Sequence, residues 1–255
     1  MKNILISGGH GRFGNWIRYY SQLNNYNVHS PTSKEMDVTD FESINSNIIK
    51  YKPDVFLHAA ALTRPLIVHE NEPYKSIENN IMGTCNVVLA CMKHNIKLVY
   101  ISTDYVYEGT DGNYDEESPL KPFNNYGWSK LGGECAVKLY ENSLTLRISM
   151  MNKPILYPKA FVDVTRSLIF DEDAAKITID LLNEFGTVNV GFESKSIYEF
   201  TKEHNPNVGK ISLNDVKAKY DWQDFLVNDV KDIKLSKNTS LNTDKMNTLL
   251  KKEER

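Results

Sequence analysis

Residues 3–14 read NILISGGHGRFG, a short apolar run that ends directly in a glycine-rich turn. Gly8, Gly11 and Gly14 have the spacing GxxGxxG, and the segment 12–23 that follows has helical character. An early glycine can adopt backbone angles that other residues avoid, and a turn without side chains lets a pyrophosphate approach the helix N-terminus. The last glycine lets the helix pack close to the strand. The alternative is an ordinary strand–helix turn, and the context favours a dinucleotide site.

Strands and helices alternate outward from this turn. Apolar strands are expected at 3–7, 27–30, 54–60, 97–102 and 144–149. Helices are expected at 12–23, 41–51 and 77–94, with a further one beginning near residue 123. Continuous apolar strands separated by helices are typical of a parallel sheet covered on both faces, with right-handed crossovers. The predicted fold class is therefore α/β, a Rossmann-like doubly wound parallel sheet.

The pattern loosens after Met150. Residues 152–161 are irregular, whereas 171–185 and 196–204 have helical patterns and 187–191 predicts a short strand. There is no internal repeat and no low-complexity linker. We therefore expect two interlaced units. They are an NAD(P)-binding Rossmann domain over 1–148 and a small C-terminal substrate-binding lobe over 149–255.

Bulk composition narrows the class of protein. The net charge of −3 and the pI near 6.1 show no excess of basic residues of the kind that nucleic-acid binding requires. No apolar run reaches the roughly 18 residues that are needed to span a bilayer. Cys85, Cys91 and Cys135 have neither metal-type nor redox-type spacing and are expected inside helices, which fits a reducing compartment. The N-terminal segment is predicted to be a buried strand rather than a signal peptide. We expect a soluble, cytoplasmic protein that binds neither nucleic acid nor a membrane.

Tyr126 and Lys130 share one helix face in the segment YGWSK, because they are four residues apart. An unperturbed tyrosine has a pKa of about 10, and a nearby ammonium favours the phenolate and lowers that pKa. Such a tyrosine can donate a proton to a carbonyl oxygen, while Thr103 or Ser102, at the end of the strand 97–102, holds that oxygen. The alternative is a surface tyrosine above a salt-bridging lysine. Together with the glycine turn, the pair predicts a centre for hydride transfer.

The tip of the second strand, HSPTSK at 29–34, bears on the choice of cofactor. NAD sites often have an acidic residue there, but none occurs before Glu35. Ser33, Lys34 and Arg12 could receive a 2′-phosphate instead, which favours NADPH and leaves NAD open. In the alternative, Lys34 and Arg12 are solvated surface charges. Side chains expected at the cofactor, besides the glycines, are Arg12, Phe13, Ser33, Lys34, Asp37 and Val38.

The chain resembles the extended short-chain dehydrogenase/reductases, and more narrowly the dTDP-4-dehydrorhamnose reductase family of sugar-nucleotide ketoreductases. Matching segments cover nearly the whole length. They are SGGHGRFG, MDVTD, KPDVFLHAAALT, NNIMGT, LVYISTDYVYEG, YGWSKLGGE, LTLRIS, RSLIFDEDAA and NTSLNTDKM. STDYVYEG together with YGWSK is the more specific part of this likeness.

The resemblance implies roles by position. The catalytic set would be Thr103, Tyr126 and Lys130, with Lys130 also holding the nicotinamide ribose. The cofactor would be lined by Ala59, Ala60, Ala61 and Ser102. The substrate would be contacted by Thr63, Asp104 and Tyr105, and by Arg166 if that side chain meets a phosphate rather than solvent. Asn80 would support the site from behind.

Three differences between this chain and related enzymes bear on the reaction and on the substrate. Related sugar-nucleotide 4,6-dehydratases carry two successive acids after the threonine, whereas Asp104 is followed here by Tyr105, which favours simple ketone reduction. The family usually has asparagine where this chain has His58, which we interpret as a packing residue at a strand end. A tryptophan-containing family segment is replaced by a short one at 150–161, so the identity of the substrate stays open.

The predicted function is NADPH-dependent reduction of the 4-keto group of a 4-keto-6-deoxy sugar nucleotide, an oxidoreductase of carbohydrate biosynthesis. One alternative is a sugar-nucleotide epimerase that keeps NAD bound. Another is a non-catalytic regulatory subunit, because the same family contains a binding partner of methionine adenosyltransferase. The Tyr126–Lys130 pair favours an enzyme. A homodimer through the cysteine-bearing and tyrosine-bearing helices stays open, and no metal site is expected beyond incidental magnesium at Glu116 and Glu117.

Overall fold

A computed structural model of the chain describes residues 1–215 and 234–253. At its centre is one parallel sheet with the strand order β10-β5-β4-β3-β1-β2. The strands are β1 (Asn3–Ser7), β2 (Asn27–His29), β3 (Val55–His58), β4 (Lys97–Thr103), β5 (Ser143–Ile148) and β10 (Gly186–Val190). The order reverses between β1 and β3, because β2 lies on one side of β1 and every later strand lies on the other. The predicted doubly wound sheet is confirmed.

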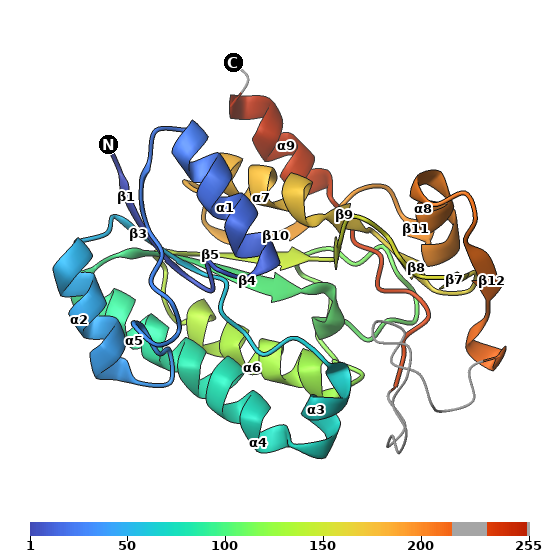
Figure 1. Ribbon diagram of the computed structural model, residues 1–255, viewed down its shortest axis with the longest axis horizontal. Coiled ribbons are helices and arrows are strands. Elements are labelled where there is room, and N and C mark those ends of the chain that lie inside the picture. Colours follow the sequence, from blue (N-terminus) through green and yellow to red (C-terminus); the bar gives the residue numbers. More distant parts are fainter. Residues whose placement is uncertain (216–233, 254–255) are drawn as a thin grey trace.

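Helices cover both faces of this sheet (Figure 1). One face carries α1 (Arg12–Leu23), α7 (Asp171–Asp180) and α9 (Asp244–Glu253); the other carries α2 (Phe41–Tyr51), α5 (Gly83–His94) and α6 (Asn125–Lys138). None of the helices within 1–215 and 234–253 has the length and apolarity that a membrane crossing requires.

Successive residues of the inner strands enter opposite cores. Ile4 and Ile6 of β1 belong to the cluster under α1 and α7, whereas Leu5 belongs to the cluster under α2 and α5. On β3, Leu57 and Phe56 are divided in the same way. The alternation of strand side chains therefore gives continuous apolar runs, since both faces are buried.

The helix expected at 77–94 does not begin as an α-helix. After α3 (Leu66–Asn71) and α4 (Pro73–Ser76), residues Ile77–Met82 form a π-helical segment, η1, that runs into α5. This segment carries Asn80, whose side-chain amide accepts from the Leu62 amide at 2.8 Å and donates to the Leu62 carbonyl at 2.9 Å and to Ser129 Oγ at 2.8 Å. Asn80 thus joins the loop after β3 to α6, as its supporting role requires.

The helix expected at 171–185 ends earlier, at Asp180. The chain then tightens through hydrogen bonds from the Leu182 amide to the Ile179 carbonyl and from the Glu184 amide to the Leu181 carbonyl. It enters β10 at Gly186, whose φ of +78° favours glycine. After this turn, β10 pairs in parallel with β5 in the central sheet.

Short two-stranded sheets complete the second half. They pair β6 (Met150–Met151) with β9 (Ile169–Phe170), β7 (Lys159–Phe161) with β12 (Gly209–Ile211), and β8 (Thr165–Arg166) with β11 (Lys195–Ser196). A separate apolar cluster forms beneath α8 (Ile197–His204), whose N-terminus is held by a capping box on Ser196. These elements lie at the end of the sheet toward which β4 and β5 point (Figure 1). Because β10 and α7 pack on the first unit, the division at residue 148 stays a prediction.

Candidate functional site

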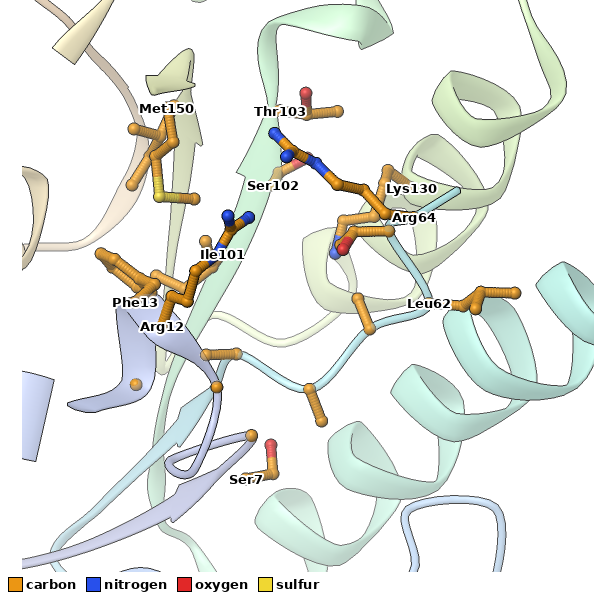
Figure 2. A pocket seen from close by; sticks show the side chains of 18 of the residues that line it. Ser7, Arg12, Phe13, Leu62, Arg64, Ile101, Ser102, Thr103, Lys130 and Met150 are labelled. Atoms are coloured by element: carbon orange, nitrogen blue, oxygen red, sulfur yellow. The ribbon is translucent and has the colours of Figure 1, made fainter. Parts of the chain in front are cut away.

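A cavity of about 610 Å³ opens over the carboxyl ends of β1, β3, β4 and β5. Figure 2 shows its lining, with the turn after β1 on one side and the end of β4 and α6 on the other. The volume lies within the range of about 300–1,000 Å³ that ligand pockets usually have. In open α/β sheets, this end of the strands at the point of reversed order is where ligands bind.

The glycine turn lies where β1 and β3 separate. Gly8 has φ +75°, and a Cβ there would lie 2.6 Å from the Ala60 nitrogen, while a Cβ on Gly14 would lie 2.2 Å from the Gly8 oxygen. A Cβ on Gly11 would meet only the Gly8 oxygen, at 3.2 Å, and otherwise open space. Gly8 and Gly14 are therefore required by the turn itself, and Gly11 leaves room in front of the amino end of α1 for a phosphate-bearing ligand.

Tyr126 and Lys130 both line the cavity from α6, and Thr103 lines it from the end of β4. The helix begins at Asn125 rather than near 123, because the Asn124 side chain caps it by accepting from the Gly127 amide at 2.8 Å. Gly127 also lets α6 approach the loop after β4, since a Cβ there would lie 2.3 Å from the Tyr105 oxygen. The fold thus brings the three predicted catalytic residues to one cavity.

Burial controls the ionisation of this pair. Lys130 is 3% exposed, and burial lowers its pKa to about 7, against the opposing charge of Glu134. Its Nζ lies 4.2 Å from the centroid of the Tyr100 ring. Burial also raises the pKa of Tyr126 well above its usual value; the Thr103 hydroxyl beside the phenol and Arg64 lower that pKa, and Asp104 raises it further.

The expected lowering of the tyrosine pKa by a neighbouring ammonium is therefore wrong for this structure. Desolvation of Tyr126 dominates, and Lys130 itself is only partly charged near neutral pH. The consequence is that Tyr126 stays protonated at neutral pH. It is placed to donate a proton rather than to accept one.

His58 ends β3 and is fully buried behind the cavity. Its Nδ1 lies 2.7 Å from Ser7 Oγ and its Nε2 lies 3.1 Å from Thr84 Oγ1. Burial, and secondly the charge of Lys130, lowers its pKa to about 3. His58 is thus a neutral residue at a strand end, as its interpretation as a packing residue requires, and it also joins β1 to α5.

The opposite end of the cavity is built around Asp104, which is 2% exposed. Its carboxylate accepts from the Thr239 hydroxyl and from Thr103 Oγ1, the latter at 3.2 Å, and its Oδ2 lies 3.5 Å from Arg166 Nε. Burial raises the pKa of Asp104, and Arg166 and the hydroxyls oppose that rise. Arg166 also donates to Ser236, at 3.2 Å to the carbonyl and 3.0 Å to the hydroxyl. The surface alternative for Arg166 is wrong, because the side chain is buried.

Most of the predicted site residues face this one cavity. The lining includes Gly8, Gly11, Arg12, Phe13, Gly14, Ser33, Asp37, Val38, Ala59, Ala60, Ala61, Ser102, Thr63, Asp104, Tyr105 and Arg166, besides the catalytic three. Lys34 does not line it and is exposed. Among the lining residues, the Ser102 hydroxyl is buried without a hydrogen-bond partner in the described part of the chain, so a polar group of the cavity is left for a ligand.

Sequence reasoning missed further lining residues. They include His10, Arg64, Asn152 and Asp171. Arg64 directly follows Thr63, so the end of the third strand was the signal that could have revealed it. Asp171 lies in the middle of the segment RSLIFDEDAA and is the first residue of α7, so the sequence suggests a role in starting the helix rather than in a cavity.

A metal site is not formed by the residues that the structure describes, since no group of three histidine, cysteine or acidic side chains gathers there. Glu116 is used otherwise, because its Oε1 accepts from the Asn189 amide at 2.8 Å. The three cysteines are free, and they lie in α5 and α6 as expected.

The family described as RmlD substrate binding domain matches residues 1–184. The chain belongs to this family. The resemblance to dTDP-4-dehydrorhamnose reductases of the extended short-chain dehydrogenase/reductase type is thereby confirmed.

Two classes of relative match the chain at similar identity. Methionine adenosyltransferase 2 subunit beta of Pongo abelii is 32% identical over 163 residues, which cover 61% of this chain and 47% of that protein. The dTDP-4-dehydrorhamnose reductase of Aggregatibacter actinomycetemcomitans is 32% identical over 152 residues, which cover 58% of this chain and 51% of that protein. The chain spans about half the length of these curated relatives.

Solved structures resemble the fold over nearly all of the chain. A dTDP-4-dehydrorhamnose reductase of Bacillus anthracis str. Ames, in complex with NADP, has a TM-score of 0.80 at 23% identity and covers 97% of this chain and 91% of its own. A hypothetical dTDP-4-dehydrorhamnose reductase of Sulfolobus tokodaii has a TM-score of 0.80 at 28% identity, with coverages of 97% and 94%.

Proposed function

We propose that the chain is a nicotinamide-dinucleotide-dependent reductase of the 4-keto group of a 4-keto-6-deoxy sugar nucleotide. The observation that carries this proposal is the convergence of Tyr126, Lys130 and Thr103 on a cavity that also contains the glycine turn. Names among the relatives support it, namely dTDP-4-dehydrorhamnose reductase and a similar structure in complex with NADP.

The cavity has the features that a dinucleotide needs. The space in front of Gly11 and the amino end of α1 would take the diphosphate, and the small side chains Ala59 to Ala61 leave room for an extended ligand. The free Ser102 hydroxyl and Lys130 would hold the end nearest Tyr126. When bound, the cofactor would supply a hydride to the carbonyl carbon.

NADPH is preferred to NADH in this proposal. Ser33 lines the cavity beyond the tip of β2 and would receive a 2′-phosphate. Arg12, also named for this role from the sequence, is instead directed toward the space that it shares with Arg64, within electrostatic reach of Asp171. Lys34 would contribute only by changing its side-chain direction, since it lies outside the lining. Asp37, the first acidic residue of the lining after β2, accepts instead from the amide and hydroxyl of Thr39, at 2.9 and 2.8 Å.

The chain's own residues would then complete the reduction. Tyr126, protonated at neutral pH because desolvation raises its pKa, would donate its proton to the carbonyl oxygen as the carbon accepts a hydride. The Thr103 hydroxyl would hold that oxygen beside the phenol. Thr63, Asp104, Tyr105 and Arg166 would face the sugar nucleotide. The product is the 4-hydroxy sugar, with one proton and one hydride added across the carbonyl.

A second candidate function is supported by the relatives themselves. Methionine adenosyltransferase 2 subunit beta matches as well as the reductase does, and that protein is a subunit of a methionine adenosyltransferase by its name. In this alternative the cavity binds a dinucleotide without turnover, and the chain serves as a subunit of another enzyme.

The distinguishing experiment is oxidation of NADPH, followed at 340 nm, with dTDP-4-keto-6-deoxy sugars, including the 3,5-epimerised form, and with NADH in parallel. Turnover supports the reductase, and Tyr126→Phe is the matched control. Tight NADPH binding without turnover on any of these sugars contradicts the stated substrate class. It favours the subunit alternative if the protein also changes the activity of an added methionine adenosyltransferase.

A further inference from the structure

Two arginines face the cavity from opposite walls. Arg12 is the first residue of α1, and Arg64 follows the small residues of the loop between β3 and α3. Figure 2 shows both side chains extended, with their guanidinium groups directed into the space between them. In that view Arg64 reaches past Lys130 toward Ser102 and Thr103. The charge of Arg64 also lowers the pKa of Tyr126, so it acts at the catalytic end of the cavity.

Neither guanidinium is engaged by a residue that the structure describes. Within residues 1–215 and 234–253, Arg12 and Arg64 form no ion pair, and neither side chain takes part in a hydrogen bond. By contrast, Arg147 and Arg166, which are buried, are each paired with a carboxylate. Arg12, which is exposed, and Arg64, which is half-buried, differ from these two because they line the cavity without an ion-pair partner among the described residues.

Asp171 is the acidic group that the two arginines share. It is 9% exposed at the start of α7 and lines the same cavity. Burial raises its pKa, and Arg12 and Arg64 both oppose that rise, so both lie within electrostatic reach of it. The Asp171 carboxylate is not in ion-pair contact with either arginine. The N–H donors of both guanidiniums are therefore left for a ligand.

The chemistry of this arrangement indicates an oxyanion ligand. A guanidinium presents a planar fork of N–H donors that matches phosphate and carboxylate oxygens, and such charge-assisted bonds are stronger than neutral ones. Two cations directed at one space repel each other, Asp171 offsets only one of the two charges, and a bound anion would offset the rest. A neutral sugar ring would relieve none of this repulsion.

We propose that Arg12 and Arg64 form a two-armed site for a phosphate or diphosphate group, with Arg64 as the arm nearest Tyr126. Arg64 lies outside the glycine turn and adds a second wall to the anion site at the amino end of α1. The anion can belong to the dinucleotide or to a phosphate-bearing second ligand. The site does not depend on the proposed reduction, because it requires only that the cavity bind such a group.

The test measures the binding of inorganic diphosphate by calorimetry to the wild-type chain, Arg64→Gln and Lys138→Gln. Lys138 lies in the last turn of α6, exposed and outside the cavity, so its variant removes the same charge elsewhere. We expect Arg64→Gln to weaken binding by about tenfold, the loss that one charge-assisted contact gives. Lys138→Gln should bind as the wild type does. Arg64→Lys keeps the charge without the fork and should fall between them.

A second arm repeats the titrations with NADP⁺ alone, and with diphosphate in the presence of saturating NADP⁺. If diphosphate competes with NADP⁺ and Arg64→Gln weakens both, the anion is that of the dinucleotide. If diphosphate still binds to the NADP⁺ complex in an Arg64-dependent way, the anion belongs to the second ligand. If Arg64→Gln and the wild type bind both probes equally, or if Lys138→Gln loses as much affinity, the proposal is overturned. These binding measurements can be interpreted even if the chain shows no reductase activity.

Discussion

The two ends of the cavity are built from residues at very different distances along the chain. At the glycine end, Gly8 to Gly14 lie in one turn, and their shape is fixed by backbone contacts within that turn and with the loop after β3. At the opposite end, Asp104 is held by Arg166 and by Thr239, which is 135 residues away in the sequence. The first end depends on backbone shape, and the second depends on buried charge.

The two ends of the cavity should therefore tolerate different kinds of substitution. A backbone cradle fails when a side chain is added, whereas a buried ion pair fails when a side chain is removed. Substitutions at the two ends should therefore destabilise the chain to different extents, most strongly at the buried ion pair.

Breaking the buried pair should be the most costly change. Arg166→Met removes the cation beside Asp104 and leaves a carboxylate at 2% exposure, so we expect the free energy of unfolding to fall by about 3–5 kcal/mol. Urea denaturation measures it. Adding Asp104→Asn to Arg166→Met should restore part of the loss, and a loss below about 1 kcal/mol in the single variant would show that the pair is not electrostatically important.

Adding one methyl group to the glycine turn should cost less. A Cβ on Gly14 would lie 2.2 Å from the Gly8 oxygen, so Gly14→Ala should lower the free energy of unfolding by about 1–3 kcal/mol.

The matched variants at Gly11 sharpen the contrast. A Cβ there meets only one atom, at 3.2 Å, so Gly11→Ala should fold nearly as the wild type does. Gly11→Val should also fold, yet it should lose dinucleotide binding, because its side chain fills the space in front of α1. Equal stability losses for Gly14→Ala and Gly11→Ala would contradict this picture of the turn.

Thr239→Val tests the long-range arm of the Asp104 site. The variant removes a buried hydroxyl that donates to the Asp104 carboxylate, so the free energy of unfolding should fall by about 1–3 kcal/mol. Thr248→Val is the control, because Thr248 is exposed on α9 and its hydroxyl bonds only the Asp244 carbonyl, at 2.8 Å. If both variants lose the same amount, Thr239 has no special role.

Much of the fold follows from local sequence, and some features do not. The helix at 41–51 was predicted to the residue, because Asp40 caps it and Lys52 ends it in the left-handed region. The π-helical start at 77–82 could not be predicted, since it accompanies contacts of Asn80 with Leu62 and Ser129 that form only on folding. The early end of α7 likewise depends on the place of β10 in the sheet.

The candidate site shows the same division. The glycines and the Tyr126–Lys130 pair are recognisable because each set lies within a few residues. Arg64 and Asp171 were missed, because their common cavity exists only once β3 and α7 are packed. Lys34 was named from proximity to the tip of β2, but a residue's place in the chain does not fix the direction of its side chain.

The pH dependence of stability should report on Lys130. Its pKa is about 7 in the folded chain, against 10.5 for an unperturbed lysine, so the unfolded chain binds more protons between these values. The free energy of unfolding should therefore rise from pH 7 toward pH 10, by up to about 1.4 kcal/mol per pH unit for this one group. Lys130→Met should lack that rise. Parallel curves for the two proteins in urea denaturation would refute the burial of an ionisable Lys130.

The central claim is that Tyr126 donates the proton in a reduction whose cofactor is held mainly by the rest of the cavity. The most direct measurement compares Tyr126→Phe with the wild type in two assays, NADPH binding by fluorescence and NADPH oxidation with a dTDP-4-keto-6-deoxy sugar. We predict nearly unchanged NADPH affinity and a loss of turnover of at least about 100-fold, because only the donated proton is missing. Full turnover by Tyr126→Phe would contradict the claim.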